Sequence, residues 1–163
     1  MQNQLSASQI PAPQSIALDL SGAEAGAPAH LMSWLPGRLR LDSAAEQIIE
    51  ELAKLLVAIH GFDPGAAKPR EYQSWADPGK RVIPQWARRP ALWERGFEEL
   101  AQPAPAYLGT FLHRDFHLGN VLWEHGQVSG VVDWVETSWG PACLDVAHAS
   151  SATCRTSLGR PRC

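Results

Sequence analysis

A polar loop that leads into a short hairpin constrains this chain more than any other feature of its 163 residues. Residues 113–120 read His-Arg-Asp-Phe-His-Leu-Gly-Asn, and the apolar run 121–123 follows directly. A second apolar run, 128–132, comes after the turn at 124–127 and ends on Asp133. Two short apolar runs around a glycine-containing turn predict a β-hairpin, which places the polar loop and Asp133 at the same end of two paired strands.

The residue order of this loop, His-Arg-Asp with an asparagine five residues after the aspartate, is that of the catalytic loop of kinases. Asp115 can orient a substrate hydroxyl or accept its proton, and the amide oxygen of Asn120 can reach a magnesium ion. The hairpin brings the carboxylate of Asp133 to the same ion, whose shell phosphate oxygens commonly complete. Asp115 and His113 are therefore the candidate catalytic residues, although the His113 ring is better suited to packing and to hydrogen bonding with the backbone. Asn120 and Asp133 are the candidate metal ligands.

The stretch from residue 111 to 148 resembles the aminoglycoside phosphotransferase family of small-molecule kinases. In that family a bulky residue follows the metal-binding aspartate, as in the Val-Asp-Trp sequence at 132–134. The Gly-Pro-Ala-Cys-Leu-Asp-Val-Ala-His sequence at 140–148 resembles the next segment of the family, and Ser-Trp-Leu-Pro-Gly at 33–37 resembles its hinge between two lobes. The likeness extends over roughly residues 10–148.

The resemblance implies an α+β fold. We expect the large lobe of a protein-kinase-like fold, mostly helical around the short catalytic-loop hairpin, with one hairpin left from the small lobe. The implied reaction transfers the γ-phosphoryl group of ATP or GTP to a hydroxyl group of a small molecule, with Mg²⁺ as the cofactor. The acceptor stays open, because aminoglycosides, macrolides, choline-like alcohols, sugars and homoserine are all served by related folds.

The resemblance also implies roles for residues outside the loop. Trp34 and Leu35 belong to the hinge, whose backbone would lie near the nucleotide base. Leu122 and Val132 would form an apolar floor under that base. Asp145 would accept hydrogen bonds from the catalytic loop and brace it.

The implied domains are a remnant of the small lobe and hinge over 1–37, a large lobe over 38–148 and an atypical tail over 149–163. Kinases hold the phosphates with a glycine-rich loop and a lysine on a strand. No glycine-rich loop precedes residue 30, and the first lysine, Lys54, follows the hinge. We therefore expect a chain truncated at both ends, with little turnover and with exposed apolar residues on its first long helix.

The longest predicted helix runs from Ser43 to His60, where Ser43 and Glu46 have the spacing of a capping box. Its apolar face consists of residues at three- and four-residue steps, namely Ile48, Ile49, Leu52, Leu55, Leu56 and Ile59. The other predicted elements are a loose lead-in over 1–15, a β-hairpin formed by Ile16–Leu20 and His30–Leu35, an irregular proline-rich stretch over 61–90, a short helix over Ala91–Leu100 and a short strand over Thr110–Leu112.

Charge and composition argue against several classes of protein. The formal net charge is −3 without a basic stripe, so we expect neither a nucleic-acid partner nor a membrane partner. No apolar run is long enough to cross a bilayer, and the N-terminus lacks the pattern of a signal peptide. The three cysteines form no CxxC pair, which favours a reducing, cytoplasmic location. The oligomeric state is left open.

Two other functions stay open. A truncated relative would bind nucleotide weakly or not at all, in keeping with the missing lysine and glycine-rich loop. A metal hydrolase would use His113, Asp115 and His117 as an HxDxH motif, because zinc sites gather three or four such ligands. The distal ligand would come from His125, His148 or Asp145. The kinase interpretation also accounts for Asn120 and Asp133, which the hydrolase leaves unused.

Overall fold

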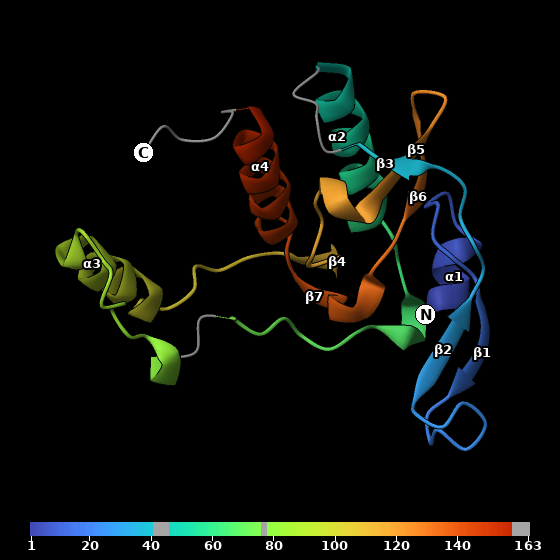
Figure 1. Cartoon of the computed structure of the whole chain (residues 1–163), viewed down its shortest axis with the longest axis horizontal. Coiled ribbons are helices and arrows are strands. Elements are labelled where there is room, and N and C mark those ends of the chain that lie inside the picture. Colours follow the sequence, from blue (N-terminus) through green and yellow to red (C-terminus); the bar gives the residue numbers. More distant parts are fainter. Residues whose placement is uncertain (41–45, 76–77, 158–163) are drawn as a thin grey trace.

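The computed structural model describes residues 1–40, 46–75 and 78–157, in which small antiparallel sheets are combined with helices (Figure 1). The helices are α1 (Gln2–Ser6), α2 (Glu46–His60), α3 (Pro90–Ala101) and α4 (Cys143–Ser157). The strands are β1 (Ser15–Asp19), β2 (Ala29–Met32), β3 (Arg38–Leu39), β4 (Gly109–Leu112), β5 (Val121–Glu124), β6 (Gln127–Val131) and β7 (Ser138–Pro141). One sheet pairs β1 with β2, a second has the order β3-β5-β6, and a third pairs β4 with β7.

The hydrophobic core forms where one face of α2 meets β4 and the β5–β6 hairpin. The helix begins at Glu46, while Ser43 of the expected capping box lies outside the described residues. The buried apolar residues of the core are Leu5, Ile10, Ala12, Ile48, Leu52, Leu55, Leu56, Ile59, Phe111, Phe116, Leu118, Val121, Trp123 and Val131. Apolar residues on the outer face of α2 stay in solvent, where Ile49 and Val57 expose 51% and 74% of their surface. We expected Ile48, Leu52, Leu55 or their neighbours to be exposed, but these three are 2%, 5% and 7% exposed, so the expectation is wrong for them and holds for the neighbouring Ile49.

Residues 1–15 belong to the core, and the expectation of a loose lead-in is wrong. Leu5 in α1 is 1% exposed, and Ile10 follows it into the core at 2%. The carbonyl of Pro11 accepts a hydrogen bond of 2.7 Å from the amide of Val131, at the end of β6. Isolated apolar residues in a polar segment give no periodic signal, so only the tertiary contacts reveal that this segment is packed.

Both predicted hairpins are confirmed. β1 and β2 are antiparallel, with Ala17 opposite Leu31. β5 and β6 are also antiparallel, and their turn contains His125 and Gly126 with φ values of 51° and 83°. Two successive positive φ values are typical of the tight turns whose twist matches that of the paired strands. The hairpin therefore joins the polar loop to the segment that carries Asp133.

The two strands that were not predicted, β3 and β7, have two and four residues. β3 has only two residues and lies against Leu122 and Trp123 of β5. β7 includes Gly140 and Pro141, yet it pairs along its length with β4, which precedes the polar loop. These pairings are long-range contacts that local sequence patterns do not encode.

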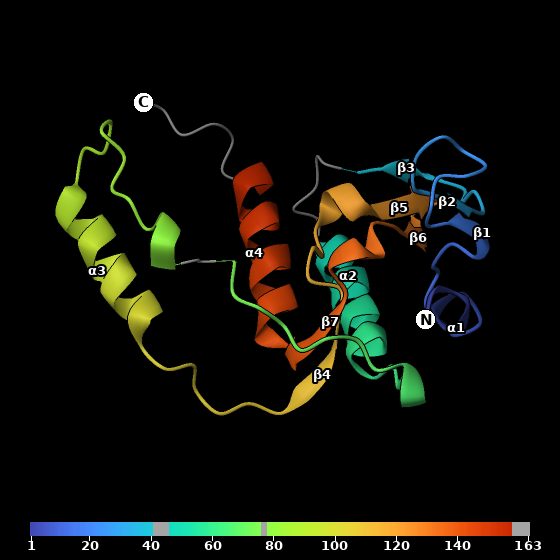
Figure 2. The same cartoon turned by 90° about the horizontal axis from the view of Figure 1, so that it is seen from below.

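The segment between α2 and β4 contains α3 and little other regular structure, as its prolines predicted. Figures 1 and 2 both show α3 apart from the other elements, joined to them by extended segments. None of the α3 residues is buried. α3 contacts the segment just before it, since the rings of Trp86 and Trp93 lie 5.9 Å apart and Arg81 donates to the carbonyls of Phe97 and Leu100.

α4 follows β7 directly and continues across the expected boundary at residues 148 and 149. The division into 1–37, 38–148 and 149–163 stays a prediction. Among the described helices, none is both long enough and apolar enough to cross a membrane.

Candidate active site

The polar loop runs from the end of β4 to the start of β5, and His113 anchors it to β6. His113 is fully buried. Its Nδ1 accepts a hydrogen bond of 3.2 Å from the amide of Asp115, and its Nε2 lies 2.9 Å from the carbonyl of Val132. These partners fix a neutral ring with the proton on Nε2. Burial lowers the pKa of His113, partly offset by the bond to Val132. Both nitrogens are thus bound to backbone groups, a geometry that suits packing and not proton transfer.

Asp145 binds the backbone of the same loop from the first turn of α4. Its carboxylate is completely buried and accepts hydrogen bonds from the amides of His113, at 2.9 Å, and Arg114, at 2.8 Å. The Nε2 atom of His60, at the end of α2, lies 3.1 Å from the same carboxylate. Arg114 has a φ of 76°, which is unusual for a residue other than glycine. Asp145 therefore holds the loop at its most strained residue and links it to both α2 and α4.

Asp115 and Asn120 are hydrogen-bonded to each other inside the loop. The amide nitrogen of Asn120 donates to the Asp115 carbonyl at 2.9 Å and to the Asp115 carboxylate at 3.0 Å. The side-chain nitrogen of Asn120 makes both hydrogen bonds to Asp115, and neither of them involves its side-chain oxygen. The backbone carbonyl of Asn120 accepts from the amide of Val132 at 3.0 Å, which joins the loop to the residue before Asp133.

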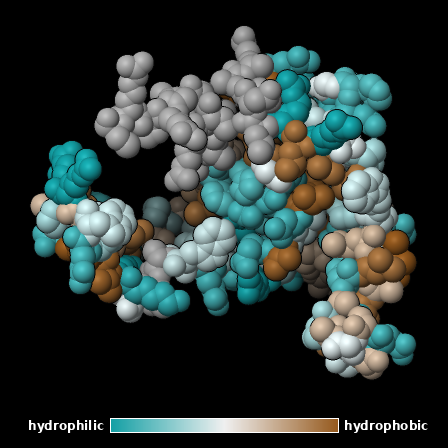
Figure 3. All heavy atoms as spheres, viewed as in Figure 1, coloured by the Kyte–Doolittle hydropathy of each residue, from teal (hydrophilic) through white to brown (hydrophobic). Residues whose placement is uncertain are grey.

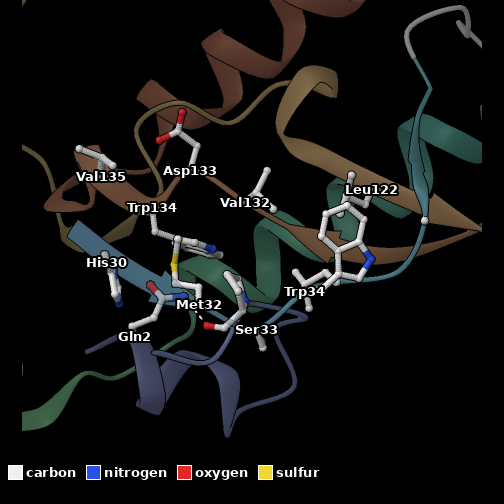
Figure 4. A pocket seen from close by; sticks show the side chains of 13 residues that line it. Gln2, His30, Met32, Ser33, Trp34, Leu122, Val132, Asp133, Trp134 and Val135 are labelled. Carbon is white, nitrogen blue, oxygen red and sulfur yellow. Dashed lines mark hydrogen bonds between the residues drawn. The ribbon is translucent and has the colours of Figure 1, made fainter. Parts of the chain in front are cut away.

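A cavity of about 580 Å³ lies between the β2–β3 connection and the end of β6 (Figure 4). Its lining includes all four residues that were expected to contact the nucleotide, together with Asp133, as follows: Trp34, Leu35, Leu122, Val132 and Asp133. Figure 4 shows the Trp34 indole beside Leu122 and Val132, with the Asp133 carboxylate at the other end of this group. The Trp34 side chain is 90% exposed, so the indole forms an open rim of the cavity.

The donor atoms at this end of the hairpin fit a hard divalent cation. Asp133 has a φ of 64° and an exposed side chain that lines the cavity, whereas Asn120 is buried and neither it nor Asp115 is among the lining residues. One carboxylate and one amide oxygen form an incomplete set for Mg²⁺, which commonly takes its remaining ligands from phosphates and water. Within the described part of the chain, no three His, Cys, Asp or Glu side chains form a group that could hold a metal ion.

The sequence profile of the phosphotransferase enzyme family matches residues 1–162. The chain belongs to this family. No curated protein matches the chain in sequence. The family identity agrees with the resemblance that the loop and the hairpin indicated.

Solved structures similar to this phosphotransferase family member share its fold. A protein from Ralstonia eutropha JMP134, provisionally named an aminoglycoside phosphotransferase, has a TM-score of 0.73 at 20% identity over 99% of this chain and 54% of its own. A thermostable variant of the aminoglycoside phosphotransferase APH(4)-Ia, in a ternary complex with ADP and hygromycin B, has a TM-score of 0.67 at 17% identity over 96% and 64%. The amicoumacin kinase hAmiN, in complex with AMP-PNP, Ca²⁺ and Ami, has a TM-score of 0.63 at 14% identity over 98% and 53%.

These likenesses confirm the expected α+β, protein-kinase-like fold. The chain spans between about half and two thirds of the length of the structures it matches. The β1–β2 hairpin, the hinge and the catalytic-loop hairpin occur together in this span.

The hydrolase alternative lacks suitable ligands among the described residues of this family member. Both ring nitrogens of His113 are engaged with the backbone, and the Nδ1 atom of His117 accepts from the amide of Gly119 at 2.9 Å. Asp145 is committed to the loop amides. The HxDxH spacing therefore reflects the packing needs of a kinase-like loop.

Three residues near the site had no assigned role in the kinase interpretation. His60 contacts Asp145, and His148 on α4 has its Nδ1 atom 3.4 Å from the Asp115 carboxylate. The guanidinium of Arg114 lies 4.5 Å from the Trp75 ring and donates to the carbonyl of Gln73 at 2.9 Å. His60 ends an amphipathic helix and His148 follows Asp145 by three residues, but these positions carry no signal that they converge on the loop.

Proposed function

We propose that this chain carries the nucleotide and phosphoryl-transfer centre of a small-molecule kinase, which moves the γ-phosphoryl group of ATP or GTP to a hydroxyl group. The observation that carries the proposal is the hydrogen bond from Asn120 to Asp115 in the loop, together with the Asp133 side chain in the lining of the cavity. The Asp115 carboxylate would serve the acceptor hydroxyl, and the oxygens of Asn120 and Asp133 would serve a cation. Membership of the phosphotransferase enzyme family supports the same reaction class.

The residues of the loop would act mainly by positioning. Asp115 would orient the acceptor hydroxyl and take its proton, while the amide nitrogen of Asn120 keeps the carboxylate in place. Asp145 and His113 would keep the loop backbone rigid through their hydrogen bonds to the His113 amide and the Val132 carbonyl. Positioning and charge stabilisation supply most of the acceleration in phosphoryl transfer, so rigidity of this loop matters for rate.

Asn120 and Asp133 would hold Mg²⁺, which neutralises phosphate charge when it is bound. Leu122 and Val132 would pack under the nucleotide base, with the backbone of Trp34 and Leu35 along its edge. The matched structures that contain ADP, or AMP-PNP and Ca²⁺, support a nucleotide and a divalent cation in general. The choice between ATP and GTP and the choice of Mg²⁺ belong to the proposal.

The acceptor would be a small molecule with a free hydroxyl group. Hygromycin B and Ami in the matched structures are chemically distinct ligands, so the fold by itself does not select one. We place the reaction in the cytoplasm, because the three cysteines have no CxxC spacing and the reaction needs nucleotide.

A coupled kinase assay against amino-alcohol, sugar and macrolide acceptors tests the proposal. We expect transfer slower than about 1 per second, the low end for kinases, and its loss in Asp115→Ala. A matched substitution on the hairpin tip, Glu124→Gln, should leave the rate unchanged, because Glu124 is exposed and lies at the turn end of the hairpin, opposite Gln127. Transfer that persists in Asp115→Ala would contradict the proposed role of the loop.

A second candidate function is that of a nucleotide-binding relative without catalysis. The described lining of the 580 Å³ cavity contains no lysine or arginine, although kinases orient the phosphates with a lysine. Tight binding of Mg·AMP-PNP without detectable transfer to any acceptor would favour this candidate over the first.

A further inference from the structure

The carboxylate of Asp115 has neighbours on both of its oxygens. Oδ2 accepts the hydrogen bond from Asn120 at 3.0 Å. Oδ1 lies 3.4 Å from the Nδ1 atom of His148, which reaches the loop from α4. The side chains of Asp115 and His148 are 29% and 33% exposed, and the Nδ1 atom that faces the carboxylate is itself buried. The carboxylate is therefore framed by the loop on one side and by α4 on the other.

The His148 ring is itself supported by aromatic contacts. The Trp75 ring lies 5.8 Å from it at an interplanar angle of 65°, and the His117 ring lies 5.8 Å away at 80°. Both are edge-to-face arrangements, which stabilise aromatic pairs. Trp75 is held in turn by the guanidinium of Arg114, 4.5 Å from its ring. These contacts form a chain from the loop backbone through Trp75 to His148.

His117 is the other imidazole near Asp115, but its geometry is less favourable. Its Nδ1 atom accepts the hydrogen bond from the Gly119 amide, so the loop itself fixes the ring. Its Nε2 atom lies 3.6 Å from Asp115 Oδ2, the oxygen that Asn120 already occupies. His148 instead faces the second oxygen and comes from a different element. His148 thus couples the position of the Asp115 carboxylate to the position of α4.

We infer that His148 is a positioning residue for Asp115: the imidazole, supported by Trp75, holds Oδ1 while Asn120 holds Oδ2, and so fixes the carboxylate that receives the acceptor hydroxyl. This inference rests on the proposed function. A carboxylate restrained at one oxygen rotates about its last torsion, whereas one restrained at both presents a fixed lone pair to the acceptor. Small misplacements of a reacting group cost up to about a hundredfold in rate, which is the size of effect such a contact protects.

The contact is tested by NMR of the imidazole nitrogens in the ¹⁵N-labelled chain, at a pH well above about 6.5, the ordinary pKa of histidine. His148→Gln assigns the signal. We expect Asp115→Asn, which removes the negative charge but keeps the shape, to shift the Nδ1 resonance of His148. The matched exchange Glu124→Gln on the hairpin tip should leave it in place. An unchanged His148 signal in Asp115→Asn would overturn the inference.

The functional consequence is tested with two substitutions of His148 in the same kinase assay. His148→Ala should lower kcat about tenfold to a hundredfold without changing KM for Mg·ATP. His148→Asn, whose amide nitrogen occupies nearly the place of Nδ1, should recover most of the loss. Equal losses in both variants, or a loss seen in KM alone, would overturn the positioning role.

Failure of the inference can be told apart from failure of the proposed function. A chain that binds Mg·AMP-PNP but lacks the His148 shift refutes the inference and leaves the nucleotide site standing. A chain that shows the shift but binds no Mg·AMP-PNP refutes the proposed function, and with it any catalytic use of the contact.

Discussion

The catalytic-loop backbone depends on one buried carboxylate. Arg114 adopts a left-handed φ, and the carboxylate of Asp145 accepts hydrogen bonds from the backbone amides of His113 and Arg114. Left-handed backbone at a residue other than glycine costs about 1 kcal/mol or more, so it persists only where the surroundings impose it. The loop therefore owes its shape to α4, an element some 30 positions further along the chain.

Removing the Asp145 carboxylate should destabilise the protein strongly. Asp145→Ala leaves two buried amides without acceptors, and we expect the free energy of unfolding to fall by about 3 kcal/mol. Urea denaturation of the purified variant measures this change. Asp63→Ala is the matched control, because the Asp63 carboxylate accepts from the amide of Gly65 at an exposed position. Equal losses in the two variants would show that Asp145 does not brace the loop.

His113 should make stability depend on pH in a defined direction. Burial lowers its pKa, so the folded protein binds the proton more weakly than the unfolded chain, whose histidine pKa is about 6.5. Its contribution to stability is complete above that pH and is lost as the pH falls towards the lowered value. In urea titrations at several pH values, His113→Gln should flatten the fall below about pH 6.5. A slope identical to that of the wild type would mean that other groups cause it.

Local sequence patterns predicted most of the individual helices and hairpins, but they did not predict which distant segments pair with one another. Alternating apolar runs and a glycine turn are local signals, and they gave both hairpins as well as α2 and α3. β3 and the segment after α1 depend on partners more than 80 positions away, and β7 pairs with β4 across the whole catalytic-loop hairpin. The same division holds for the site, since the loop motif named Asp115, Asn120 and Asp133 without any sign of His60 or His148. Those two histidines reach the loop only through the packing of α2 and α4.

The turn of the catalytic-loop hairpin offers a sharp test of the element that delivers Asp133. Gly126 has a φ of 83° with open space around it, so Gly126→Ala should cost about 1 kcal/mol through the backbone alone. Gly96 in α3 also has open space but ordinary helical backbone. Gly96→Ala should therefore stabilise the helix by up to about 1 kcal/mol. Thermal unfolding of the two variants should give shifts of opposite sign, and shifts of the same sign would argue against the turn geometry.

For the molecule as a whole, several apolar surfaces face solvent. Figure 3 shows hydrophobic atoms on α3 and on the β1–β2 hairpin. Leu92 and Leu100 on α3 are 47% and 52% exposed, and Ile16 and Leu18 on β1 are 60% and 58% exposed. Exposed apolar area of this kind promotes association between chains.

We therefore expect the 163-residue chain to self-associate as its concentration rises. Sedimentation velocity should show a mass that increases with concentration, and Leu100→Lys should reduce the increase by placing a charge on α3. Val135→Lys is the comparison variant for this increase in mass, because Val135 is also exposed but lies away from α3 in sequence. A clean monomer at high concentration with cooperative thermal unfolding would contradict this expectation.

The central claim is that Asp133 and Asn120 serve a metal–nucleotide site at the cavity, and calorimetric titration with AMP-PNP tests it most directly. We expect binding that requires Mg²⁺ and weakens at least about tenfold in Asp133→Asn, which corresponds to about 1.4 kcal/mol. Binding to Glu124→Gln should stay within about twofold of the wild type, because this carboxylate lies at the far end of the hairpin. Binding that ignores Mg²⁺, or that is equal in Asp133→Asn and Glu124→Gln, would contradict the account.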